Sequence, residues 1–229
     1  MFPARHSILI AGSSTAGLVE FSCYLASTYL QSDQRVLFIA ADVPIDQLRG
    51  QFARFDIDAS EREDDGELAF IECVSAAAQG DSGGEPKRTC DMKDLETLLR
   101  TTDEMLSSLD ESFARIVLYS VTPMFMYHDQ DSLSIFFETL SLKAKRYGSL
   151  TAVIHNDVLT ETQVGCIEAV VDGVIDVRVD ADFRRYVMIK CIEGLTVKPA
   201  WVPIEAIKGE EAGAGAFLKW RRGASDDAD

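Results

Sequence analysis

The sequence has 229 residues, of which 47% are hydrophobic, and its 38 acidic and 22 basic side chains give a formal net charge of −16. This length favours one domain with small appendages, and the apolar content excludes a wholly disordered chain. The charge argues against a nucleic-acid partner, because phosphate contact needs a basic face. No apolar run approaches the roughly 18 residues of a membrane span, and the apolar core near the start is too short for a secretory signal. We therefore expect a cytoplasmic protein without membrane insertion.

Short apolar runs alternate with segments of helical periodicity along most of the chain. The expected strands span residues 7–11, 36–41, 68–74, 116–119, 150–154, 174–179 and 186–192. The expected helices span residues 18–30, 44–55, 95–109, 133–147 and 161–171. Gly148 fits the end of the fourth helix. Residues 76–91 are small, polar and rich in glycine and predict a surface loop, and a further β-like stretch covers residues 197–207.

The early strands are continuous apolar runs, which is typical of strands buried on both faces. Their alternation with helices predicts an α/β fold with a mostly parallel central sheet flanked by helices, and the last two strands predict a closing antiparallel hairpin. We expect this domain to cover residues 1–194. Residues 195–229 are expected to form a C-terminal extension with an acidic, disordered tail.

The cysteines are odd in number and widely scattered, without a C-x-x-C motif or a Cys/His cluster. They are Cys23, Cys73, Cys90, Cys166 and Cys191. We expect them to be reduced and mostly buried as small apolar residues, and we expect no metal site.

A small-residue loop follows the first strand and precedes the first helix. It consists of Gly12, Ser13, Ser14, Thr15, Ala16 and Gly17. Its G-x-x-x-x-G spacing is that of a phosphate-binding loop, in which backbone N–H groups and a helix N-terminus face an anion. Such a loop also needs a Lys for the phosphates and a Ser or Thr for Mg²⁺. Leu18 and Val19 stand at those two positions.

At this loop the chain resembles the RecA superfamily, and within it the KaiC-like ATPases of archaea, which include the ATP-binding archaellum accessory proteins. The resemblance extends through residues 35–48, 115–122, 170–177 and 184–190, which are similar to the second strand and helix, the Walker-B strand and the closing hairpin of that family. It covers about residues 7–194 and implies a RecA-like P-loop NTPase fold.

Carried over position by position, the resemblance implies a degenerate ATPase site. The catalytic acidic pair falls on Asp42 and Val43, and the Walker-B acid falls on Tyr119, followed by the family's Ser as Ser120. The Lys that ends the hairpin is kept as Lys190. Each charged hydrogen bond that is lost weakens the free energy of ATP binding by about 1.5–3 kcal/mol. We therefore expect no catalytic residue, a vestigial nucleotide site at residues 12–17 and Asp42, and at best weak ATP binding.

Other candidate residues each allow two interpretations. Asp42 is either a functional residue or a helix cap near Pro44. Residues 155–157 either have a catalytic or sensing role or form a polar loop in which Asp157 caps the next helix. The apolar segment 124–127 is either lid packing or a partner contact. Trp220, with its basic neighbours Lys219, Arg221 and Arg222, is either a docking element or part of a loose tail.

Two functions follow from the resemblance. The first is a non-catalytic regulatory or scaffolding protein in signal transduction or a motility-type assembly, which binds a protein partner or copies of itself. The alternative is an atypical ATP-binding protein or weak ATPase completed by a partner subunit. The surplus of Asp, with 8 Lys against 22 Asp, favours a halophilic source.

Stability should depend on salt. Repulsion among the acidic side chains is weakly screened at low ionic strength, where the Debye length is about 30 Å at 0.01 M. We expect the melting temperature to rise steeply between about 0.1 M and 1 M KCl. Comparing KCl with sulfate at matched ionic strength separates screening from anion exclusion, because only exclusion makes sulfate the stronger stabiliser. A melting temperature that stays flat over this range contradicts the halophile interpretation.

Overall fold

The computed structural model describes residues 4–74, 88–108 and 114–204. Its elements are β1 (Ser7–Gly12), α1 (Leu18–Leu30), β2 (Arg35–Ala40), α2 (Ile45–Ala53), α3 (Ala59–Asp64), β3 (Leu68–Val74), β4 (Arg88–Asp91), α4 (Leu95–Ser108), β5 (Ala114–Tyr119), η2 (Thr122–Met126), α5 (Gln130–Tyr147), β6 (Gly148–His155), α6 (Glu161–Glu168), β7 (Gly173–Val179), β8 (Arg185–Ile192) and β9 (Val202–Pro203). Among the described residues, no helix is both long enough and apolar enough to cross a membrane.

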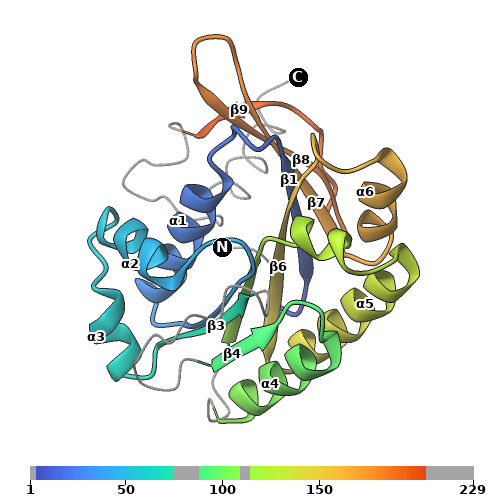
Figure 1. The fold of residues 1–229 in the computed structure, drawn as a ribbon. Helices are drawn as coiled ribbons and strands as arrows, with labels where there is room; N and C mark the ends of the chain where they lie inside the picture. Colours follow the sequence, from blue (N-terminus) through green and yellow to red (C-terminus); the bar gives the residue numbers. More distant parts are fainter. Residues whose placement is uncertain (1–3, 75–87, 109–113, 205–229) are drawn as a thin grey trace.

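The described strands form one sheet in the order β4-β3-β2-β5-β6-β1-β7-β8-β9 (Figure 1). Pairing is parallel from β4 to β7 and antiparallel between β7 and β8, and β9 extends the sheet antiparallel to β8. The predicted fold class, a mostly parallel sheet that closes in a hairpin, is confirmed. The boundary at residue 194 stays a prediction.

Helices cover both faces of the sheet, with α1, α2 and α3 on one side and α4, α5 and α6 on the other (Figure 1). Successive side chains of a strand point to opposite faces. Ile8 and Ile10 therefore join the core cluster beneath α1 and α2, and Leu9 and Ala11 join the cluster beneath α4, α5 and α6. Burial on both faces explains why residues 8–11 of β1 are all apolar.

Several elements differ from the sequence prediction. The helix expected over residues 161–171 ends at Glu168, η2 was not expected, and in the described part of the stretch 197–207 only Val202–Pro203 form a strand. The loop expected over residues 76–91 is wrong at its end, where β4 pairs with β3, and residues 76–87 lie outside the described part. The short α3 was not expected, because its sequence, ASERED, contains almost no apolar residue. Asp58 starts this helix by accepting hydrogen bonds from the amides of Ser60 (3.0 Å) and Glu61 (3.2 Å).

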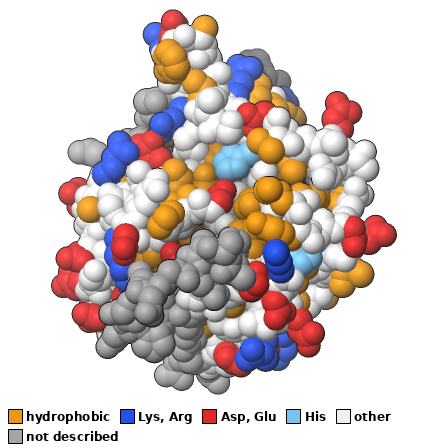
Figure 2. All heavy atoms as spheres, in the orientation of Figure 1, with side chains coloured by type: hydrophobic (Ala, Val, Ile, Leu, Met, Phe, Trp, Pro, Cys, Tyr) orange, Lys and Arg blue, Asp and Glu red, His pale blue; other side chains and the backbone are white. Residues whose placement is uncertain are grey.

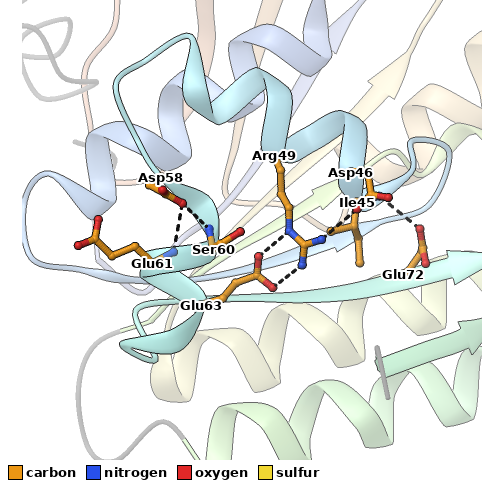
Figure 3. Close-up of polar contacts among 8 residues, drawn as sticks. All are labelled: Ile45, Asp46, Arg49, Asp58, Ser60, Glu61, Glu63 and Glu72. Carbon is orange, nitrogen blue, oxygen red and sulfur yellow. Dashed lines mark hydrogen bonds and ion pairs between the residues drawn. The ribbon is translucent and has the colours of Figure 1, made fainter. Parts of the chain in front are cut away.

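Charged side chains join α3 to α2 (Figure 3). The Arg49 guanidinium donates to both carboxylate oxygens of Glu63, at 2.8 and 2.9 Å, and also to Asp46. The hydrogen bonds to Glu63 are the main cause that raises the pKa of Arg49. Glu72 of β3 accepts a 3.2 Å hydrogen bond from the Ile45 amide and so holds the first turn of α2 at the carboxyl edge of the sheet.

Asp172 ties the start of β1 to the end of α5. Its carboxylate accepts hydrogen bonds from the Ser7 amide (2.6 Å), the Ser7 hydroxyl (2.8 Å) and the Lys145 ammonium (2.7 Å). Burial opposes ionisation of Asp172, but the hydrogen bonds from Lys145 and Ser7 outweigh it and lower the pKa below the ordinary value of 3.8.

Gly148 allows β6 to start close to β5. A Cβ at this position would lie 1.6 Å from the carbonyl oxygen of Ala114, which is impossible without backbone movement. The prediction that the preceding helix ends here is confirmed, although Gly148 is extended (φ 176°) and does not adopt the left-handed conformation of a common helix cap.

Gly148→Ala should destabilise the fold by at least about 2 kcal/mol, because the sheet must open to accept the methyl group. Gly165→Ala is the matched control. A Cβ at Gly165, within α6, meets nothing within 4 Å, so this change should be neutral or stabilising by about 0.5–1 kcal/mol. Urea unfolding of both variants tests the difference, and equal stability would contradict the close approach of β5 and β6.

Asp172→Asn should lower the free energy of unfolding by about 1.5–3 kcal/mol at neutral pH, through loss of charged hydrogen bonds. A carboxyl whose folded pKa is lowered adds stability above its unfolded pKa, and this stability is lost as the pH falls through the folded pKa. The difference between wild type and variant should therefore shrink below pH 3.8. Urea unfolding at several pH values measures it, and a difference independent of pH would overturn the assigned charge.

Candidate functional site

The glycine loop has close neighbours at both ends, a backbone carbonyl at Gly12 and a side chain at Gly17. A Cβ on Gly12 would lie 2.7 Å from the Val177 carbonyl oxygen, so β1 and β7 approach here as only glycine allows. Gly17 precedes α1 with φ 67°, in the left-handed region, and a Cβ there would meet the Arg185 guanidinium at 2.7 Å. The two glycines of the motif therefore have structural reasons to be present.

The two aliphatic residues after the loop face the protein interior. Leu18 is 2% exposed and belongs to the core beneath α1, and the partly buried Val19 packs against the same core. Neither residue offers a cation to a phosphate or a hydroxyl to Mg²⁺. Their contribution is hydrophobic and anchors the first turn of α1.

Asp157 binds the loop at Ser14. Its carboxylate accepts hydrogen bonds from the Ser14 amide (2.9 Å) and the Ser14 hydroxyl (2.8 Å). Burial opposes ionisation, but these two hydrogen bonds outweigh it and lower the pKa of Asp157. The expectation that Asp157 caps the next helix is wrong. Thr160 caps α6 and forms a capping box with Gln163.

A second polar group lies where β2, β5 and β6 end. The Ser120 hydroxyl donates to Asp42 at 2.8 Å, and the Tyr119 hydroxyl lies 3.3 Å from Nε2 of His155. Asp42 therefore bonds to the end of β5 and does not cap α2, which begins after Pro44. Partial enclosure of the Asp42 carboxylate raises its pKa, and the Ser120 hydrogen bond opposes that shift. Burial likewise raises the pKa of Tyr119, which keeps its hydroxyl protonated.

A cavity of about 260 Å³ opens beside this group at the ends of β2 and β3. Its lining is mainly apolar, with the carboxylates of Asp42 and Glu72 as the acidic groups, and comprises Ala41, Asp42, Val43, Pro44, Glu72, Cys73, Met92, Pro123 and Tyr127. No residue of the glycine loop lines it. Across the described residues, no three His, Cys, Asp or Glu side chains gather as a metal site would require.

Apolar side chains are exposed at the same edge of the sheet. We call Met126 (78% exposed), Tyr127 (40%) and Val158 (65%) the apolar patch; they follow the ends of the neighbouring strands β5 and β6. Figure 2 shows hydrophobic side chains gathered near the middle of this face, beside a histidine. Met124 is fully buried, so the segment 124–127 divides between core packing and exposed surface.

Several contacts of the site join residues far apart in the sequence. Arg185 lies against Gly17 and donates to Glu20 at 2.6 Å across 165 positions, and the Asp157–Ser14 contact spans 143. No local pattern signals such contacts. Lys190, the Lys at the end of the hairpin, forms an ion pair with Glu168 of α6 at 2.7 Å. The segment around Trp220 lies outside the described residues.

The comparisons with known proteins agree on the family and the fold. The family model of the ATPase KaiC matches residues 1–209. The chain is also similar to the crystal structure of a KaiC-like protein from the hyperthermophilic archaeon Pyrococcus horikoshii OT3. The identity is 15% and the TM-score 0.68, over 88% of this chain and 86% of that one, which is a likeness of fold. No curated protein matches the sequence.

Proposed function

Because the chain belongs to the KaiC ATPase family, we propose that it is a member that does not hydrolyse ATP and that acts as a regulatory or scaffolding protein. It works through protein–protein contacts, with a protein partner or with copies of itself, in signal transduction or a motility-type assembly. The acidic, lysine-poor composition supports a place in the cytoplasm of a salt-loving archaeon.

The observation that carries this proposal is the internal carboxylate at the glycine loop. A bound phosphate would need the Ser14 amide, and Asp157 already occupies that amide and the Ser14 hydroxyl. A second anion at the same place would meet like-charge repulsion. With Leu18 buried in the core, the position that supplies the phosphate-binding Lys contributes packing instead.

The Walker-B position adds support. Tyr119 takes the place of the acid that would hold Mg²⁺, and its hydroxyl contacts His155 at 3.3 Å. Phosphoryl transfer depends on neutralising the charge of the transferred group and on positioning it. In the family, a Lys, a hydroxyl and an acid neutralise and position the phosphoryl group. This chain has Leu18, Val19 and Tyr119 at those three positions.

The apolar patch supports a role in protein binding. Met126 and Val158 expose most of their apolar surface at the carboxyl edge of the sheet, the edge at which open α/β folds bind their ligands. Exposed apolar side chains gathered at one place indicate an interaction surface.

The alternative function, ATP binding completed by a partner subunit, draws on a different observation. Asp42 and Ser120 are both kept and form a 2.8 Å hydrogen bond at the ends of β2 and β5. In this alternative, the partner supplies the missing cation and Asp42 retains a role in positioning water.

Calorimetry with Mg·ATP in concentrated KCl separates the two functions. Through loss of at least two charged hydrogen bonds, we expect a dissociation constant weaker than about 1 mM. Asp42→Ala should bind ATP no differently from the wild type. Tight binding by the wild type would overturn the proposal, and tight binding only after addition of a partner would establish the alternative.

Changing the apolar patch should abolish partner binding without unfolding the protein. We expect the double variant Met126→Asp and Val158→Asp to lose the partner in co-purification from the native host, or to lose self-association in sedimentation. Leu142→Asp is the matched control, because Leu142 is 60% exposed but lies on α5. Its stability and the stability of the double variant should stay within about 0.5 kcal/mol of the wild type. Equal loss of binding in the Leu142→Asp control would contradict the proposal that the apolar patch binds the partner.

A further inference from the structure

Two cysteines that the sequence separates by a long segment are neighbours in the sheet. Cys73 of β3 lies directly opposite Cys90 of β4 in the parallel register. Both side chains point into the core beneath α4, α5 and α6, where they are 3% and 2% exposed. Neither is in a disulfide, so the structure holds two free thiols side by side on one face of the sheet.

The strand that carries Cys90 is short and lies at the edge of the described sheet. β4 has four residues, is the edge strand of the described sheet and pairs with β3 alone. Paired strands lie about 4.8 Å apart, and disulfides join Cα atoms separated by about 4.4–6.8 Å. The spacing of the two strands therefore suits a disulfide after a small movement of the edge.

Cys73 also lies at the wall of the cavity. It lines the 260 Å³ cavity together with Met92, which follows β4, and with Tyr127. The cavity therefore reaches the position of Cys73 in β3, and Cys90 lies one strand further toward the edge.

We propose that Cys73 and Cys90 are a site of reversible oxidation, at which a low-molecular-weight disulfide converts the two thiols into a bond that fastens β4 to β3. The Cys73 thiolate attacks one sulfur of the reagent, forming a mixed disulfide and releasing one thiol. The Cys90 thiolate then attacks the Cys73 sulfur and releases the second thiol. Two electrons pass from the cysteine pair to the reagent, and the two cysteine protons end on the released thiols.

The surroundings make this reaction slow. Burial raises the pKa of both thiols, so only a small fraction is present as the reactive thiolate. The bond would close the chain between β3 and β4 and would fix the cavity wall to which Met92 belongs. This site does not depend on the proposed function, because it uses neither the glycine loop nor the apolar patch.

The test is to incubate the full chain with oxidised glutathione and to map its peptides by mass spectrometry without reduction. We expect a Cys73–Cys90 cross-link that dithiothreitol reverses. Cys191→Ala is the matched control, since Cys191 is the exposed cysteine on β8, and it should form the same cross-link. Cys90→Ala should stop at glutathione bound to Cys73. The cross-link should raise the melting temperature of the wild type by roughly 5 °C, because it constrains the unfolded chain.

Two results would overturn the proposal. One is modification of Cys191 alone, with Cys73 and Cys90 still reduced after long incubation at mildly alkaline pH. The other is a cross-link that lowers the melting temperature, which would identify a strained bond formed from the unfolded chain. The wild-type peptide map decides the first point without reference to any variant, so a failure of Cys90→Ala to fold does not affect it.

Discussion

The parallel register of β1 between β6 and β7 fixes where the glycine loop lies relative to Asp157. Gly12 pairs with His155 on one side and with Val177 on the other, and the approach to Val177 leaves no space for a Cβ. Because the parallel strands all run the same way, the residues that follow them meet at one edge. Asp157, two positions after the end of β6, is thereby brought to Ser14.

Under the proposed function, that arrangement explains how the chain keeps the family fold while the chemistry of its site changes. A phosphate loop depends on backbone amides that point toward an anion. Here a carboxylate of the same chain provides the anion, and an aliphatic side chain fills the core where the family has a Lys. The Ser14 amide and hydroxyl thus find their hydrogen-bond partner within the chain. Under the proposed function, the exposed apolar patch beside the loop provides the surface for a partner.

The sequence predicts the buried parts of the fold well and the polar contacts poorly. Strands such as β1 and β2 are recognisable because burial on both faces requires apolar runs. β4 was missed, since four residues at an edge leave no pattern, and α3 was missed because it is almost wholly polar. The pairing of Cys73 with Cys90 depends on how β3 and β4 align, which residue spacing does not reveal.

At the candidate site, too, the sequence predicts the local structure but not the contacts between distant residues. The glycine spacing predicted the turn from β1 to α1, and the absence of Lys and Ser or Thr after it was visible in the sequence itself. The partner of Ser14 was not visible, because the helix-cap pattern near Asp157 is satisfied by Thr160 instead. Local rules place a side chain on an element, and only the tertiary fold decides which distant group it meets.

The most direct test of the account is the rate at which phosphate is released from Mg·ATP by the purified chain in concentrated KCl. The account predicts a rate equal to that of the buffer alone, for the wild type and for Asp42→Ala. Release that depends on the protein and disappears in Asp42→Ala would contradict it, and would establish Asp42 as the catalytic residue of a working ATPase.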